Sequence, residues 1–316
     1  MSDEITKILI AATGGIASKD IITKLLGPSA DYIGEGARSL VEKSSRNLRR
    51  IFDVACGKLG NKIDSQGGVN ARVLKGVWEE GRYIEDAISA EYFGGLLAGA
   101  RTTDGADDSA VPALSLLKAM SSQQLRLHFI IYSLLARYPF ATKRLDAHEF
   151  WKGLHVAVSV DELLLAAQFD GGDGAAILLL ATKGLIDHGL LGWRYAFEYG
   201  GLKESSGITP AFDFITLTPN KAGASLFLRA LGQRGLHPEL ITAINVDHSL
   251  SDDIKSSVQL PPNATCYHSP VEDSIRPLHD DVEDRLLEVE SDVEELKDEL
   301  RRSKTDAESK RKKKPV

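Results

Sequence analysis

The chain has 316 residues, 43% of them hydrophobic and 26% charged, which is the composition of a globular protein with room for about two domains. Its net charge of −7 excludes a protein that binds polyanions over its whole surface. The two cysteines, Cys56 and Cys266, are far apart and outside any CxxC motif, which supports neither a disulfide framework nor a zinc site and fits a reducing compartment.

The start of the chain and its apolar runs argue against export and membrane insertion. The first residues, MSDEITK, are acidic, whereas a secretory signal begins with a basic region. The longest apolar runs are Ile8–Ala12 and Ala175–Thr182, far below the roughly 20 residues that span a bilayer. We therefore expect a cytoplasmic protein without a membrane span.

A small, apolar N-terminal segment, residues 1–27 with Gly14 and Gly15, precedes a predicted helical core over residues 28–138. Apolar residues recur at helical spacing through this core, and glycines break the pattern. Thr102–Ser109 is polar and predicts a loop, and Pro139 ends the block. Helices are expected from Pro28, from Asn70, over Ile84–Ala100, over Val111–Met120 and over Ser122–Tyr138.

Residues 139–236 predict a winged-helix-like domain of mixed helices and strands. Two helices are followed by two alternating, strand-like segments, with turn and loop formers between the strands, and then by another helix. This order of helix, helix, two-stranded wing and helix is typical of a winged helix. The expected elements are helices at Val160–Gln168, Ala175–His188 and Pro219–Leu231 and strands at Trp193–Tyr199 and Phe212–Leu217.

A linker and a short coiled-coil helix are expected to follow. Residues 237–275 contain four prolines and many Ser and Asp residues, which indicates a linker with little fixed structure. Residues 276–300 carry an apolar stripe with the alternating spacing of a coiled-coil seam, through which we expect the chain to self-associate weakly, since it has fewer than three heptads. The seam residues are Val282, Leu286, Val289, Val293, Leu296 and Leu300.

Charge separates sharply at this end of the sequence. Residues 272–300 hold 13 acidic and 3 basic residues, and residues 301–316 hold 8 basic and 2 acidic ones. The basic tail can attract nucleic acid or an anionic surface weakly and without sequence preference, remain solvated, or fold back on the acidic helix. Its candidate contact residues are Lys310, Arg311, Lys312, Lys313 and Lys314.

The segment Lys7–Lys19, KILIAATGGIASK, resembles the opening of the flavin-dependent phosphopantothenoylcysteine decarboxylases. In those enzymes an apolar strand runs into a TGGIA turn, and a helix N-terminus holds the flavin phosphate. That interpretation requires a second strand soon after the first helix, but Ile21–Leu26 is followed by predicted helices. An amphipathic N-terminal helix is favoured, a flavin-binding enzyme is a lesser alternative, and no cofactor is expected.

Other possible catalytic patterns are incomplete. The histidines of HEFWKGLH, His148 and His155, are seven residues apart instead of the four of HExxH. A polar face is favoured there, although two helical turns leave a metal pair open. The chain has no GxSxG elbow, and the aspartates of Thr102–Ser109 miss the calcium-loop spacing. We therefore predict no enzyme, with no catalytic, cofactor-binding or metal residues.

The winged-helix interpretation raises the question of DNA binding. Its recognition helix would be Ala175–His188, which has one lysine, Lys183, and no arginine. Residues 143–234 contain 9 basic and 10 acidic residues, so this region has little with which to neutralise phosphates. A protein-contacting or structural winged helix is favoured, and a DNA-associated regulator is the main alternative.

The stretch Lys24–Arg137, about a third of the chain, resembles the abortive infection alpha family of bacterial anti-phage proteins. The resemblance implies a role in phage exclusion but no catalytic residues, and family members often carry a downstream winged-helix-like region. A tryptophan is common where this chain has Tyr92 or Phe93, a mild departure. The matching segments are KLLGPSADYIGEGARSL (Lys24–Leu40), RNLRRIFDVACGKL (Arg46–Leu59), WEEGRYIEDAISAEYFGGLLAGA (Trp78–Ala100) and SAVPALSLLKAMSSQQLRLHFIIYSLL (Ser109–Leu135).

The sequence thus predicts a mainly α protein with a multi-helix core, a winged-helix-like α+β domain, a linker and a C-terminal coiled-coil helix. Its expected function is non-enzymatic phage defence through protein–protein contacts. The partner would be a protein, with a phage-encoded one among the candidates.

Overall fold

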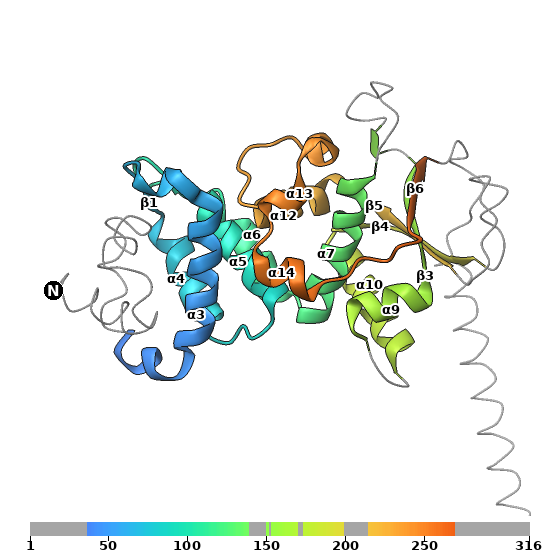
Figure 1. Cartoon of the computed structure of the whole chain (residues 1–316), viewed down its shortest axis with the longest axis horizontal. Coiled ribbons are helices and arrows are strands. Elements are labelled where there is room, and N and C mark those ends of the chain that lie inside the picture. Colours follow the sequence, from blue (N-terminus) through green and yellow to red (C-terminus); the bar gives the residue numbers. More distant parts are fainter. Residues whose placement is uncertain (1–36, 139–149, 152, 170–172, 199–213, 269–316) are drawn as a thin grey trace, which may run out of the picture. The chain divides into compact units, whose positions relative to one another are not determined.

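A computed structural model of the chain describes residues 37–138, 150–151, 153–169, 173–198 and 214–268, without the side chains of 37–45 and 193–198. Within these residues the fold is mainly helical with a small antiparallel sheet (Figure 1), which confirms the mainly α class. None of the described helices is long and apolar enough to cross a membrane.

Capping side chains define where three helices of the first block begin, which are α4 (Ala71–Gly81), α5 (Ala87–Gly99) and α7 (Ser122–Arg137). The Asn70 side chain accepts a hydrogen bond from Arg72 N at 2.9 Å, and the Asp86 side chain accepts one from Ser89 N at 2.8 Å. Ser121 opens the last helix with a capping box.

The helices predicted from Asn70, over Ile84–Ala100, over Val111–Met120 and over Ser122–Tyr138 are present within a few residues of their expected bounds. The third of these is α6 (Val111–Ala119). Helix α3 is described over Ala37–Leu59, and the start predicted at Pro28 lies outside the described residues.

Helix α5 is buried around its whole circumference from Ile88 to Ala98. A helix of this kind lies inside a core, with other helices on several sides. Two consecutive glycines make this possible, because a Cβ on Gly94 would overlap Val54 and the Ile51 carbonyl of α3. A Cβ on Gly95 would overlap the backbone of Ala230 in α12 (Lys221–Ala230). The glycine pair therefore lets α3 and α12 both approach α5 closely.

Four strands form the larger sheet, in the order β4-β5-β3-β6, with all neighbouring pairs antiparallel. The strands predicted near Trp193–Tyr199 and Phe212–Leu217 are β4 and β5, whereas β3 and β6 were not predicted. Five of the six residues of β3 are buried, so this strand lacks the polar–apolar alternation of a half-exposed strand. The bounds are β3 (Leu154–Ser159), β4 (Leu191–Glu198), β5 (Phe214–Pro219) and β6 (Thr265–His268).

A second, two-stranded sheet joins the loops of the helical block. Strands β1 (Gly68–Val69) and β2 (Arg101–Thr102) pair antiparallel, and β1 follows the short 3-10 helix η2 (Gly60–Asp64). Arg101 donates hydrogen bonds to the carbonyls of Lys62 and Ser65. These bonds hold the end of α5 against the loop that precedes α4.

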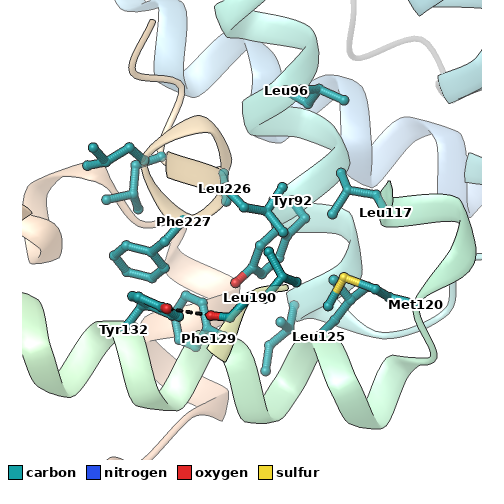
Figure 2. Close-up of a cluster of buried hydrophobic side chains, with 14 of the residues drawn as sticks. Tyr92, Leu96, Leu117, Met120, Leu125, Phe129, Tyr132, Leu190, Leu226 and Phe227 are labelled. Carbon is teal, nitrogen blue, oxygen red and sulfur yellow. Dashed lines mark hydrogen bonds between the residues drawn. The ribbon is translucent and has the colours of Figure 1, made fainter. Parts of the chain in front are cut away.

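Helix α7 lies between α5 and the larger sheet (Figure 1) and links the two halves of the described chain. The helices α9 (Val160–Ala167) and α10 (Gly174–Asp187) also pack on it. In α7, the Phe129 and Tyr132 rings lie 5.8 and 6.3 Å from the Phe227 ring of α12 (Figure 2). The side chains of the predicted helical core and the predicted winged-helix-like domain thus share one hydrophobic core.

Residues 238–257, which we call the strap, are structured. The expectation that residues 237–275 form a linker with little fixed structure is therefore wrong for the part of that segment up to His268. The strap contains η3 (Pro238–Ala243), α13 (Val246–Ser249) and α14 (Asp252–Ser257). Apolar residues spaced between the polar ones hold it to the core, and burial of each stabilises it by about 1.5–3 kcal/mol. These anchors are Ile241, Val246, Leu250 and Ile254.

An ion pair beneath the strap adds a polar anchor. Lys58 Nζ of α3 lies 2.6 Å from Glu91 Oε1 of α5, and both side chains are buried. The same ammonium donates to the Ser249 carbonyl at 2.7 Å, and Ser251 N donates to Glu91 Oε1 at 3.3 Å. The pair therefore joins α3, α5 and the strap at one point.

Candidate protein-interaction surface

The helix α10 is apolar on both faces, although only one face packs on the core. Leu178, Ala181, Thr182 and Leu185 follow the i, i+3, i+4, i+7 spacing of a buried face and are buried. Helix α10 packs against helix α7 and strand β4 of the larger sheet. Ile177 and Ile186 are half-buried against the core, which leaves Ala175, Ala176, Leu179 and Leu180 for the outer face.

Leucines are exposed on the outer faces of α9 and α10. Leu180 is 70% exposed and Leu165, on α9, is 74% exposed, while Leu179 next to Leu180 is also exposed. Ala175 and Ala176 are exposed one turn before them. Fully covering a leucine side chain is worth about 1.5–3 kcal/mol, so a partner that covered these residues would gain binding free energy. We call these five residues the outer face.

The charges near the outer face are few, and carboxylates outnumber the single lysine. Lys183 is the basic residue of α10, and its Nζ lies 3.2 Å from Asp187 Oδ1 on the next turn. The first turn of α9 carries two carboxylates, Asp161 and Glu162. Specific DNA-binding helices contact phosphates and base edges with several basic and polar side chains. The outer face therefore suits an apolar protein surface better than a nucleic-acid backbone.

Comparison of the chain with models of protein families, with curated proteins and with solved structures finds no match.

The predicted seam and tail lie outside the described residues and stay predictions. These are Val282, Leu286, Val289, Val293, Leu296 and Leu300 for self-association, and Lys310, Arg311, Lys312, Lys313 and Lys314 for weak contact with nucleic acid or an anionic surface. The segment Lys7–Lys19 with its TGGIA turn also lies outside them.

The structure places only part of the histidine pattern HEFWKGLH. His155 lies on β3 with its ring stacked on that of Tyr267, 5.2 Å away, so the helical spacing considered for HEFWKGLH does not apply to it. His148 and Glu149 lie outside the described residues. Across the described ranges, no three His, Cys, Asp or Glu side chains group as a metal site would need.

Both thiols are shifted away from reactivity. Burial raises the pKa of Cys56 to about 11 and that of Cys266 to about 12. A nucleophilic cysteine needs the opposite shift, because the thiolate is the reactive form. The two cysteines therefore behave as packing residues.

The sequence interpretation missed a buried polar chain in the core. The hydroxyl of Tyr92 on α5 hydrogen-bonds to Nδ1 of His128 on α7. Tyr132 lies one helical turn after His128, and its hydroxyl donates to the Leu190 carbonyl at 2.6 Å. Asn220 N, at the start of α12, donates to the same hydroxyl at 3.0 Å. A histidine within the apolar run of LHFIIY was the available signal, because such a residue must be paired when it is buried.

Acid should destabilise the protein through His128. Burial lowers the pKa of His128 from 6.5 to about 3, so the folded state resists the proton that the unfolded chain accepts. The contribution of His128 to the free energy of unfolding is fully present above about pH 6.5. It is lost as the pH falls towards 3, by at most about 1.4 kcal/mol per pH unit for this one proton. Urea unfolding from pH 7 to 4 should show a steeper loss for the wild type than for His128→Gln. Equal pH slopes would contradict the assignment.

Proposed function

We propose that the chain is a non-enzymatic phage-defence protein of the abortive infection alpha type that acts through protein–protein contacts. The family assignment is supported by the segments within Lys24–Arg137 that resemble that family. The mode of action is supported by one observation above all, the exposed leucines of the outer face on α9 and α10.

A winged-helix-like domain is part of this proposal. The order α7, β3, α9, α10, β4, β5, with β5 between β3 and β4 in the sheet, supports it. In a winged helix, the second helix of the pair is the recognition helix, and α10 would be its counterpart. With Lys183 already paired to Asp187, we expect this helix to contact an apolar, weakly charged surface of a protein partner.

A DNA-associated regulator is the second candidate, because the same order of elements is common among DNA-binding domains. It predicts that binding of duplex DNA depends on Lys183 and falls steeply with salt. The two candidates therefore place the functional requirement on different residues, the exposed leucines of α9 and α10 for a protein partner and Lys183 of α10 for DNA.

Phage protection should depend on the exposed leucines. Leu165→Asp with Leu180→Asp should weaken protection in a plaque assay by about tenfold or more, because losing even one leucine contact costs about 1.5 kcal/mol or more. The folding stability should stay within about 0.5 kcal/mol of wild type, since both side chains are exposed. The locus would be expressed in a bacterial host with its neighbouring genes.

The matched control is Lys183→Ala, which removes the α10 cation and leaves the leucines. It should leave protection unchanged if the outer face contacts protein. Loss of protection in Lys183→Ala together with full protection in the double leucine variant would favour the DNA-associated regulator instead. A wild-type locus that protects against no phage in a broad panel would remove the defence proposal itself.

A further inference from the structure

A groove of about 670 Å³ lies where the strap crosses α3. One wall is α3, the other is the strap from His248 to Asp253, and Leu231 and Gln233 close one side. Pockets that bind small molecules typically measure about 300–1,000 Å³. The groove is distinct from the outer face of α9 and α10, and its role does not depend on the proposed function.

Three arginines line the α3 wall. Arg46, Arg49 and Arg50 follow the i, i+3, i+4 spacing that puts residues on one face of a helix. Arg50 is held in place, since its Nη1 donates to the Glu85 carbonyl at 2.6 Å. A guanidinium group held in this way can donate two parallel hydrogen bonds to two oxygens of one phosphate. Arginine predominates at phosphate sites for this reason.

Asp53, Asp252 and Asp253 also line the groove, and the two of them that pair with arginines are more exposed than those arginines. Arg49 and Arg50 are 30% and 33% exposed, whereas their partners Asp53 and Asp253 are 51% and 59% exposed. The two pairs have N–O distances of 3.6 and 3.3 Å. Such exposed pairs contribute at most about 1 kcal/mol, so a ligand with several negative charges can displace them.

The lining of the groove offers a further polar group. Ser251 lines the groove, and its hydroxyl is buried without a hydrogen-bond partner among the described residues. A buried hydroxyl without a partner costs free energy, and a bound acceptor would remove that cost. Lys58 lies beside it with its charge offset by Glu91.

We propose that this groove binds a phosphate-bearing small molecule of nucleotide size. The guanidinium groups of Arg46, Arg49 and Arg50 hold the phosphates, and the Ser251 hydroxyl donates a hydrogen bond to the ligand. Leu231 and Val54 also line the groove and offer apolar contacts to the uncharged part of such a molecule.

Gly57 provides the sharpest test, because it lines the groove and a Cβ added there would meet nothing within 4 Å. Gly57→Glu places a carboxylate in the groove, and Gly57→Gln places a neutral side chain of the same shape there. Both replace a helical glycine, so neither should weaken folding. Calorimetric titration of the full chain with ATP, pyrophosphate and inorganic phosphate, at 150 mM salt, compares wild type with these variants and with Arg49→Ala/Arg50→Ala.

We expect ATP or pyrophosphate to bind the wild type and Gly57→Gln, and to bind Gly57→Glu and the arginine variant at least tenfold more weakly. Tighter binding of ATP than of pyrophosphate supports a ligand of nucleotide size. Equal binding would support the phosphate contacts and overturn the nucleotide size. Binding that Gly57→Glu and the arginine variant leave unchanged would place the anion elsewhere, for instance on the basic tail, and would overturn the proposal. Absence of binding by all three probes would overturn it as well.

Discussion

Replacing Gly95 by alanine is expected to prevent stable folding or to lower the free energy of unfolding by more than about 4 kcal/mol, a range that few single substitutions reach. The added Cβ would lie 1.8 Å from the Ala230 carbonyl oxygen. That oxygen belongs to the backbone of α12, so it cannot swing aside as the end of a side chain could. The overlap far outweighs the gain of about 1 kcal/mol in helix propensity from glycine to alanine.

Urea denaturation followed by circular dichroism measures this effect, and Gly99→Ala on the same helix is the matched control. There the nearest atom to the added Cβ is the Gly232 carbonyl oxygen at 3.6 Å, an ordinary contact. We expect Gly99→Ala to unfold at or slightly above the wild-type urea concentration. A Gly95→Ala protein with the stability of Gly99→Ala would show that α5 and α12 do not cross this closely.

Removing the carboxylate of Glu91 should cost about 3–5 kcal/mol, because the Lys58 ammonium would remain buried without its partner. The two side chains are 0% and 4% exposed and their charged atoms lie 2.6 Å apart. Burial already lowers the pKa of Lys58, and the attraction of Glu91 opposes this only in part. Without Glu91 that pKa should fall further, so raising the pH should restore part of the stability of Glu91→Leu.

The double variant Lys58→Met/Glu91→Leu tests the cause. It removes both charges and should recover most of the loss, although the Ser249 carbonyl and the Ser251 amide lose their partners. The exposed pair Lys75–Glu79, at 3.7 Å, is the control, and Glu79→Leu should change stability by less than about 1 kcal/mol. A double variant as unstable as Glu91→Leu would show that packing, and not charge, is decisive at this site.

Elements with strong local signals could be predicted from the sequence. The helices α4 and α7 begin at side chains that cap their own backbone, Asn70 and Ser121, so a few neighbouring residues determine where they start. β4 and β5 alternate and are bounded by turn formers, and they too were predicted. β3 was not, because a strand with neighbours on both sides and burial on both faces has no distinctive periodicity.

The candidate sites could be predicted only in part. The apolar character of α10 was visible in GAAILLLATKGLID, but the sequence could not show which leucines remain exposed. The groove was not predicted, because its arginines and Ser251 are about 200 residues apart in the sequence. Prolines and polar residues suggested a linker where the structure has the strap.

By itself, the sequence of this protein determined the mainly helical class, the position of most helices and the two strands of the predicted wing. Caps, prolines and apolar periodicity act over a few residues, so the amino acids alone specify them. Only the tertiary structure decided that Gly94 and Gly95 serve close helix crossings, that His128 is neutral in the core, and that Lys58 and Glu91 hold the strap. Each of these depends on atoms brought together from distant parts of the chain, where overlap, desolvation and pairing act over a few ångströms of space and not along the sequence.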